Sequence, residues 1–234
     1  MITLHQYHLS PFNEKIQRML NYKGIPFEER YWALGDRKKV QAMNPTGKLP
    51  ALQHGGHVVC DSTDMAHYIE ENFPQQPLIP SEPRLRAQVH VLEDWADESL
   101  YFYEMHLRFT TPGNRERNIP RMVEHEGAFL RWLLKKVIPG GIVRITASQG
   151  IGRKSIGQLL VDVERHIAAV DGLLDGSDWL VGNQLSLADL AVYAMFQALR
   201  DADMVVEMLA RYPAVTAWMT RVETHTGTRT ARGN

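Results

Sequence analysis

The sequence predicts two domains of different class, an α/β domain followed by an all-α domain. In the first 80 residues, short stretches with the two-residue alternation of strands are interleaved with short helical stretches, in the order βαβ and then ββα. Beyond them apolar residues recur at helical spacing, with no convincing strand pattern. A proline-bearing connector at residues 75–80 separates the two halves. We therefore expect domains over residues 1–80 and 84–224.

Turn residues divide the first half into its elements. Ile2 and Leu4 share one face of the first strand, and the following helix begins after Ser10-Pro11 and ends at Gly24, a common helix stop. The later elements are a strand, a short helix, a hairpin and a last helix, expected at residues 27–31, 37–42, 52–60 and 63–72. The βαβ part implies a parallel strand pair, and the hairpin implies an antiparallel pair.

The second half is expected to consist of helices only. A long helix carries its apolar face over residues 85–107, and further helices are expected at residues 121–137, 156–174, 187–199 and 215–222. Ser186 and Asp189 have the spacing of a capping box at the start of one of these helices. The polar residues 224–234 are expected to fray.

Composition limits the classes of function. The chain has 234 residues and a formal net charge of −1, which argues against a nucleic-acid binder that depends on overall basic charge. The single cysteine, Cys60, allows no intrachain disulfide and fits a reducing compartment. The N-terminus lacks the pattern of a signal peptide, and no stretch approaches the roughly 18 apolar residues of a membrane span. These features predict a cytosolic chain without a membrane partner.

Three other features are interpreted without invoking function. Residues 127–161 hold several basic residues and no acidic one, which could bind an anion but is more often a solvated face. The ten histidines show no metal-ligand spacing with other ligands, and His125-Glu126 lacks the second histidine of the metalloprotease pattern. We therefore expect no metal site. Cys60 lies in an expected strand and is interpreted as a small core residue.

Ser10-Pro11-Phe12-Asn13 lies where the first strand gives way to the first helix. A helix start presents unpaired backbone N–H groups and the positive end of the helix dipole. Thioredoxin-like redox proteins carry C-x-x-C there, and the S-x-x-N of this chain excludes disulfide exchange by that motif. A serine hydroxyl could instead donate a hydrogen bond to a bound thiolate. The alternative is that Ser10 merely caps the helix, and the tetrapeptide alone favours this alternative.

Two more segments could bind a ligand. In Lys48-Leu49-Pro50, a cis Leu49–Pro50 bond would turn the Leu49 backbone toward a ligand, and an ordinary Gly/Pro turn is an equal alternative. Asp61-Ser62 begins the last helix of the first half. The Ser62 hydroxyl and the helix-start N–H groups suit a carboxylate, while Asp61 suits an ammonium group. Together they would recognise an amino-acid-like group, although this pair alone favours a simple N-cap.

In their order and spacing these segments resemble the cytosolic glutathione transferases. Ser10-Pro11-Phe12 is similar to the active-site segment of the serine-type classes, especially the tau class, and in the omega class a cysteine replaces that serine. The remaining stretches that carry the resemblance are Asn44-Pro45-Thr46-Gly47-Lys48-Leu49-Pro50-Ala51-Leu52, Asp61-Ser62, Trp179-Leu180-Val181-Gly182, Ser186-Leu187-Ala188-Asp189, and Arg211-Tyr212-Pro213 with Trp218. The segment 135–157 departs from the family pattern, so the class and the electrophile stay open.

The resemblance implies a thioredoxin-like N-terminal domain that binds glutathione, an all-α C-terminal domain that contributes a pocket for a small electrophilic substrate, and a homodimer. Its glutathione-binding residues would be Lys48, Leu49, Pro50, Asp61 and Ser62. Of these, Asp61 and Ser62 would hold the γ-glutamyl end, the Leu49 backbone the cysteinyl unit, and Lys48 a carboxylate. Ser10 would be the catalytic residue that stabilises the thiolate. The electrophile pocket is expected to include Phe12, Tyr103 and His106.

Two other functions fit the same resemblance. A chain with this fold could bind glutathione and a partner without catalysing turnover. It could also use glutathione as a cofactor in an isomerisation or a reductive dehalogenation. Steady-state turnover separates the first alternative from a transferase, and product analysis separates the second.

Overall fold

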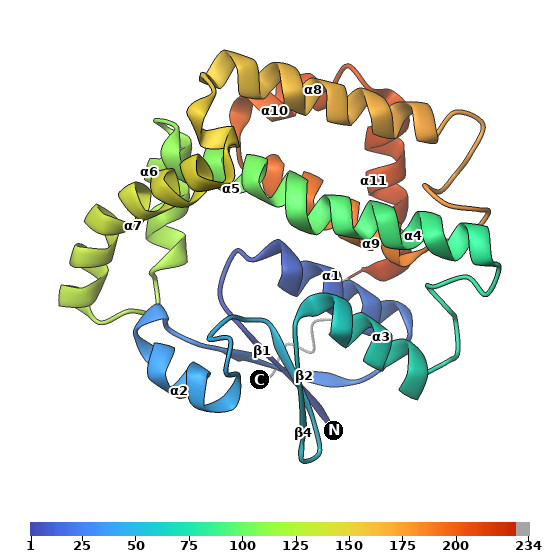
Figure 1. The fold of residues 1–234 in the computed structure, drawn as a ribbon, viewed down its shortest axis with the longest axis horizontal. Coiled ribbons are helices and arrows are strands. Elements are labelled where there is room, and N and C mark those ends of the chain that lie inside the picture. The colour runs from blue at the N-terminus through green and yellow to red at the C-terminus, as the bar shows by residue number, and fades with distance from the viewer. Residues whose placement is uncertain (228–234) are drawn as a thin grey trace.

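The computed structural model describes residues 1–227 of the chain. An N-terminal domain built on a four-stranded sheet lies below a larger helical domain in the view of Figure 1. Its elements are β1 (Ile2–Gln6), α1 (Pro11–Tyr22), β2 (Phe27–Tyr31), α2 (Arg37–Met43), β3 (Ala51–His54), β4 (His57–Cys60) and α3 (Ser62–Asn72). The predicted order, βαβ followed by ββα, is confirmed.

The sheet has the strand order β2-β1-β3-β4. β1 pairs in parallel with β2, whereas β3 pairs antiparallel with both β1 and β4. Leu4 of β1 lies opposite Leu52 of β3, and both side chains are fully buried. Helices α1 and α3 contact each other and lie between the sheet and the helical domain (Figure 1). The apolar cores of the two domains are therefore continuous. The loops that precede α1 and α3 lie on the side of the N-terminal domain that faces the helical domain.

The helical domain follows residues 73–82, which form neither helix nor strand. Its helices are α4 (Pro83–Trp95), α5 (Tyr101–Thr110), α6 (Asn114–Met122), α7 (Ala128–Gln149), α8 (Ile156–Leu173), α9 (Leu187–Leu199), α10 (Asp203–Leu209) and α11 (Pro213–Thr226). A π-helical turn, Ala96–Leu100, joins α4 to α5. Within residues 1–227 no strand lies beyond Cys60, and no helix there has the length and apolar character that crossing a membrane requires.

Two expectations about helices are wrong, and one helix was not predicted. Residues 121–137 do not form one helix, because α6 ends at Met122 and a turn precedes α7 at Ala128. Gly127 occupies the N-cap of α7 and is the sequence signal for this break. An isolated glycine can also lie inside a helix, so this signal did not divide the predicted helix. The seven-residue helix α10 is too short to show a helical period. Residues 224–226 lie within α11 rather than in a frayed end, and residues 228–234 lie outside the described part of the chain.

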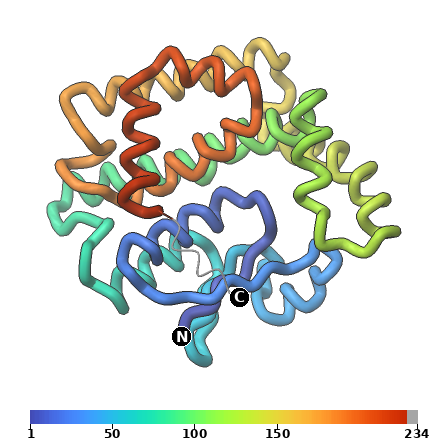
Figure 2. Tube along the Cα trace, turned by 180° about the vertical axis from the view of Figure 1, so that it is seen from behind, coloured from blue at the N-terminus to red at the C-terminus, as the bar shows by residue number. Residues whose placement is uncertain are grey.

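The two domains are joined through α1. This helix packs against α9 and α11, and Figure 2 shows α11 returning from the far side of the helical domain toward it. The Arg18 guanidinium donates hydrogen bonds to the Tyr193 hydroxyl, at 3.0 Å, and to Thr226 Oγ1, at 2.7 Å. Arg18 and Tyr193 are both buried. Charge-assisted hydrogen bonds of this kind are stronger than neutral ones, so they fix the orientation of α1 against the helical domain.

The capping box at the start of α9 is present, and its carboxylate has a larger role than capping. Asp189 Oδ2 accepts from the backbone N–H of Ser186 and from its hydroxyl, at 2.9 and 2.7 Å. Its Oδ1 accepts from the Leu180 N–H and from Trp218 Nε1, each at 2.9 Å. Asp189 is fully buried, so one carboxylate satisfies four buried donors from three segments of the helical domain.

Asp189→Ala is expected to lower the free energy of unfolding by about 3 kcal/mol, because several buried donors lose their acceptor at once. Loss of an ordinary cap costs about 0.5–2 kcal/mol. The matched control is Ser155→Ala, which removes the exposed capping box of α8. Denaturant unfolding of both variants measures the difference. Equal losses in the two variants would show that Asp189 acts only as a cap.

Candidate functional site

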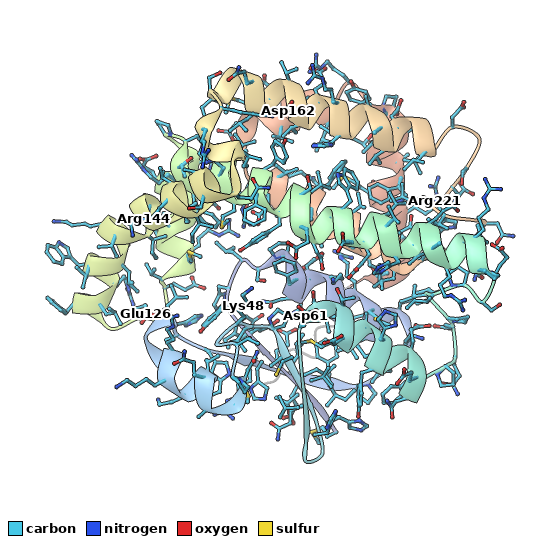
Figure 3. All side chains as sticks on the ribbon, in the orientation of Figure 1. Lys48, Asp61, Glu126, Arg144, Asp162 and Arg221 are labelled. Carbon is cyan, nitrogen blue, oxygen red and sulfur yellow. The ribbon has the colours of Figure 1, made fainter. Side chains whose placement is uncertain are left out.

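A cavity of about 790 Å³ lies between the two domains. Its N-terminal wall comes from the β1–α1 loop, the loop before β3 and the start of α3, and its other wall from the α4–α5 helix and α7. Figure 3 shows Lys48 and Asp61 at the edge of the N-terminal domain that faces the helical domain. The structure brings these sequence-predicted residues together in the lining: Ser10, Phe12, Lys48, Leu49, Pro50, Asp61 and Ser62.

Ser10 is the N-cap residue of α1, but its hydroxyl makes no capping hydrogen bond. The helix start is satisfied in other ways. Pro11 has no N–H, and the Asn13 N–H reaches the Ser10 backbone carbonyl at 3.2 Å. The Asn13 side chain instead donates to the Tyr7 carbonyl and holds the preceding loop. The Ser10 hydroxyl therefore lies at the cavity without a capping role, at the positive end of the α1 dipole.

The Lys48-Leu49-Pro50 segment is shaped by a buried asparagine. Asn44 Nδ2 donates to the Lys48 carbonyl at 2.8 Å, and its Oδ1 accepts from the Thr46 N–H at 2.9 Å. The Leu49–Pro50 peptide bond is cis, which is one of the two alternatives that the sequence left open. Lys48 is exposed at the end of this turn, where its ammonium group can contact an anion.

Asp61 and Ser62 divide their roles at the start of α3. Asp61 is the N-cap and accepts from the Thr63 N–H at 2.9 Å, whereas Ser62 is buried and its hydroxyl donates to Asp97 Oδ2 at 3.3 Å. Asp61 has a φ of 88°, in the region that favours glycine. A non-glycine residue in such a conformation costs about 1–3 kcal/mol, and such residues concentrate at ligand sites.

Behind Ser62 lies a buried group of one lysine and two carboxylates that sequence reasoning missed. Lys15 of α1 is fully buried and donates to Glu93 Oε1 at 2.7 Å and to Asp97 Oδ2. Glu93 also accepts from Thr63 Oγ1 at 2.7 Å, and the buried Asp97 Oδ1 has no hydrogen-bond partner among the described residues. Only pairing across the domain boundary creates this group, so no spacing within either half could have predicted it.

The pKa values of the three groups in this buried cluster shift in different directions. Burial works against the charge of Lys15, but the two carboxylates outweigh it and raise the pKa of Lys15. Burial also disfavours the Glu93 anion, yet Lys15 and the hydrogen bonds lower its pKa. Burial raises the pKa of Asp97 to about 6, against the lowering effect of Lys15. One ammonium group cannot satisfy two carboxylates equally, and Asp97, which has the unpartnered oxygen, is the less satisfied one.

The helical wall of the cavity is apolar and aromatic. Tyr101, Met105 and Phe109 lie four residues apart along α5 and share the face that lines the cavity. The Phe12 ring lies 4.8 Å from the Tyr101 ring, centroid to centroid. The far side is closed by apolar residues of α7, among them Ile138. Of the residues predicted for the electrophile pocket, Phe12 lies in this lining.

Tyr103 and His106 do not line the cavity, so their predicted place in the electrophile pocket is wrong. Tyr103 lies on the opposite face of α5, where its hydroxyl donates to Asp162 Oδ2 of α8 at 3.4 Å. His106 is buried against α7, with its Nδ1 2.8 Å from Thr146 Oγ1. Successive helical residues turn by about 100°, so the Tyr101 face cannot also present Tyr103.

Arg108 connects α5 to the loop that carries Ser10. Its guanidinium donates to the Leu9 carbonyl at 3.2 Å, to Glu104 Oε2 at 2.8 Å and to Asp201 Oδ2 at 2.9 Å. Leu9 has a φ of 63°, a conformation that a residue with a branched side chain adopts only when its surroundings hold it. The helical domain thus fixes the backbone directly before the active-site serine candidate.

Comparison with known proteins identifies the family. The family model for the N-terminal domain of glutathione S-transferases matches residues 4–77, and the model for their C-terminal domain matches residues 136–225. Together the two matches cover well over half of the chain. The chain belongs to the glutathione S-transferase family.

Individual relatives are more distant. FtsZ-localized protein A of Caulobacter vibrioides is 28% identical over 82% of this chain and 74% of its own length. Protein LigF of a Sphingobium species is 27% identical over 94% of this chain and 90% of its own length. Glutathione S-transferase U22 of Arabidopsis thaliana is 35% identical, but over only 43% of this chain and 47% of its own length.

Solved structures share the fold. A glutathione S-transferase from Rhodospirillum rubrum superposes with a TM-score of 0.72 at 21% identity, over 96% of this chain and 88% of that one. One from Methylobacterium radiotolerans, in complex with glutathione sulfonate, gives a TM-score of 0.64 at 23% identity, over 95% of this chain and 90% of that one. These likenesses support the thioredoxin-like and all-α assignment of the two domains.

Proposed function

We propose that this chain is a glutathione transferase in which Ser10 stabilises the thiolate of bound glutathione. One observation carries the proposal. The Ser10 hydroxyl lies at the start of α1 in the inter-domain cavity and is not used to cap the helix. A hydrogen bond to a charged group contributes about 1.5–3 kcal/mol, and a helix N-terminus about 0.3–1 kcal/mol. Together they would lower the pKa of the bound thiol by about 1–3, enough to ionise much of it near neutral pH.

The other lining residues would hold the peptide. Asp61 and Ser62 suit the amino-acid-like γ-glutamyl end, the Leu49 backbone suits the cysteinyl amide, and Lys48 suits the terminal carboxylate. Asp97 adds a carboxylate beside Ser62, which favours an ammonium group at that end. This division places the thiol between the Ser10 loop and the helical wall.

The electrophile would bind against the aromatic wall of Phe12, Tyr101 and Phe109. That lining suits a substrate with an aromatic or other flat apolar part. LigF, to which the chain is similar, has a solved structure described as a β-etherase. We therefore propose attack of the thiolate sulfur on an electrophilic carbon, with the leaving group departing with the bonding electron pair.

Ser62→Ala is expected to weaken glutathione binding about tenfold. In the complex the Ser62 hydroxyl would turn from Asp97 to the γ-glutamyl carboxylate, and the alanine variant loses that charge-assisted hydrogen bond while the backbone N–H groups remain. Isothermal titration calorimetry measures the change. Ser81→Ala, at an exposed position of the inter-domain segment, is the matched control and should bind like the unmodified chain. If the unmodified chain binds no glutathione at millimolar concentration, the proposed function fails.

A second candidate is a glutathione-binding protein that acts through a partner without turnover. Similarity to FtsZ-localized protein A favours it, as do exposed apolar side chains on α7, where Phe129 and Trp132 are 76% and 54% exposed. Steady-state assays with a panel of electrophiles, following thiol consumption and product identity, separate the candidates. Turnover with any member of the panel supports the transferase. For either candidate we propose a cytosolic homodimer, as the family resemblance implies.

A further inference from the structure

Two histidines and a glutamate from both domains converge beside the cavity. His8 lies in the β1–α1 loop and lines the cavity, whereas Glu124 and His125 lie in the turn between α6 and α7. Their potential ligand atoms all lie within 4.8 Å of one another. Glu124 Oε1 is 3.4 Å from His8 Nδ1 and 3.4 Å from His125 Nε2.

We propose that His8, Glu124 and His125 form a binding site for one divalent transition-metal ion, such as Zn²⁺ or Co²⁺. The spacing supports this assignment. Zinc binds imidazole nitrogen and carboxylate oxygen at about 2.0–2.2 Å, so neighbouring ligand atoms of a tetrahedral site lie about 3.3–3.5 Å apart. Both nitrogen–oxygen distances in this cluster agree with that spacing between ligand atoms. Three protein ligands leave the fourth position for water.

The donor set suits a transition metal rather than Ca²⁺ or Mg²⁺. Imidazole nitrogen favours Zn²⁺, Co²⁺, Ni²⁺ and Cu²⁺, whereas the two alkaline-earth ions prefer oxygen ligands. A histidine must be neutral to bind a metal. The two imidazoles and one carboxylate of this cluster therefore match a transition metal better than an alkaline-earth ion.

The turn that carries two of the ligands is held in place without a metal. Arg131 Nη2 donates to the backbone carbonyls of Glu124 and Glu126, at 2.7 and 2.8 Å. The Glu126 side chain is buried and accepts from the Gly35 N–H at 3.2 Å, which ties the turn to the N-terminal domain. Figure 3 shows Glu126 where the start of α7 approaches the region of α2. Binding would therefore need little ordering of this turn.

The third ligand is held by aromatic contacts. The His8 ring stacks on the Tyr31 ring, with centroids 4.2 Å apart, and lies 4.3 Å from the His125 ring. Within residues 1–227 its buried Nε2 has no hydrogen-bond partner, so stacking rather than a competing hydrogen bond sets the ring position. Because His8 precedes Ser10 by two residues, a bound ion would link the Ser10 loop to the helical domain.

This assignment reverses the expectation of no metal site. That expectation rested on ligand spacing along the sequence, and His8 is far from Glu124 and His125 in the chain. Only the closure of the two domains brings them together. A surface ion pair is the competing explanation of the same contacts, and it requires protonated imidazole and no metal.

The test is a titration of the full chain, without a histidine tag and without glutathione, with ZnCl₂ by calorimetry and with CoCl₂ by visible absorption. We expect one ion per chain and the absorption of a low-symmetry, four-coordinate Co²⁺. Loss of an outer-shell partner alone weakens metal affinity about 10- to 100-fold, so His8→Ala and His125→Ala should each weaken it at least that much. At a Zn²⁺ concentration of about 100 times Kd, the melting temperature should rise by about 5–10 °C.

Three variants keep the result interpretable. Glu124→Gln, an isosteric change at a half-exposed side chain, should weaken binding even if an alanine variant folds poorly. His67→Ala, at an exposed histidine on α3, and Cys60→Ser should bind as the unmodified chain does. The proposal is overturned if the unmodified chain binds no stoichiometric ion, or if the Glu124 and His125 variants bind it as tightly as the unmodified chain.

Discussion

Replacing Ser10 with alanine is expected to slow glutathione conjugation by about 10- to 100-fold, because the thiolate loses a hydrogen bond worth about 1.5–3 kcal/mol. Glutathione affinity should stay nearly unchanged, since the peptide contacts lie in other segments of the lining. Steady-state kinetics gives kcat, and calorimetry gives Kd for glutathione. A loss confined to Kd, with kcat unchanged, would contradict a role in thiolate stabilisation.

Ser10→Cys is the complementary variant. The cysteine would lie at the start of α1, where the helix dipole lowers a thiol pKa and favours a mixed disulfide with glutathione. Conjugation should fall and thiol-transferase activity should appear. If Ser10→Ala leaves conjugation intact, the backbone N–H groups at the same helix start become the leading alternative.

Lys15→Met is expected to lower the free energy of unfolding by about 3–5 kcal/mol, because it leaves two buried carboxylates without their ammonium partner. Lys15 and Glu93 are essentially inaccessible to solvent, and Asp97 is nearly so. Since the group lies behind Ser62, glutathione binding should weaken as well. Chemical denaturation followed by circular dichroism measures the first effect, and calorimetry measures the second.

Lys39→Met is the matched control for Lys15→Met. Lys39 forms an exposed pair with Asp36, and isolated surface pairs contribute little to stability. Its unfolding midpoint should not move measurably. Equal behaviour of the two variants would show that the buried group does not stabilise the fold.

The N-terminal half was predictable because its information is local. Ser10-Pro11 marks a helix start through turn chemistry, and the βαβ–ββα order follows from strand alternation and a short hairpin. Asp61-Ser62 predicts the start of the next helix in the same way. The structure places the residues of these separate segments in the lining of one cavity. The family resemblance, rather than the spacing of the residues by itself, implied that they form one site.

The helical half was less predictable because its site depends on which face of a helix meets the other domain. A helical pattern on α5 shows that Tyr101 and Tyr103 lie on different faces, but not which face lines the cavity. The sequence around Asp97 does not predict that this residue is buried, because its partner Lys15 belongs to the first domain. The break between α6 and α7 carries no strong stop signal except Gly127.

The central claim is that this chain binds glutathione and ionises its thiol at the start of α1. The most direct measurement is the ultraviolet absorbance of the thiolate in the glutathione complex, followed across pH for the unmodified chain and for Ser10→Ala. The unmodified complex should titrate at a pKa about 1–3 lower than that of free glutathione, and the Ser10→Ala complex nearer to the free value. A bound thiol that titrates like free glutathione would contradict the claim.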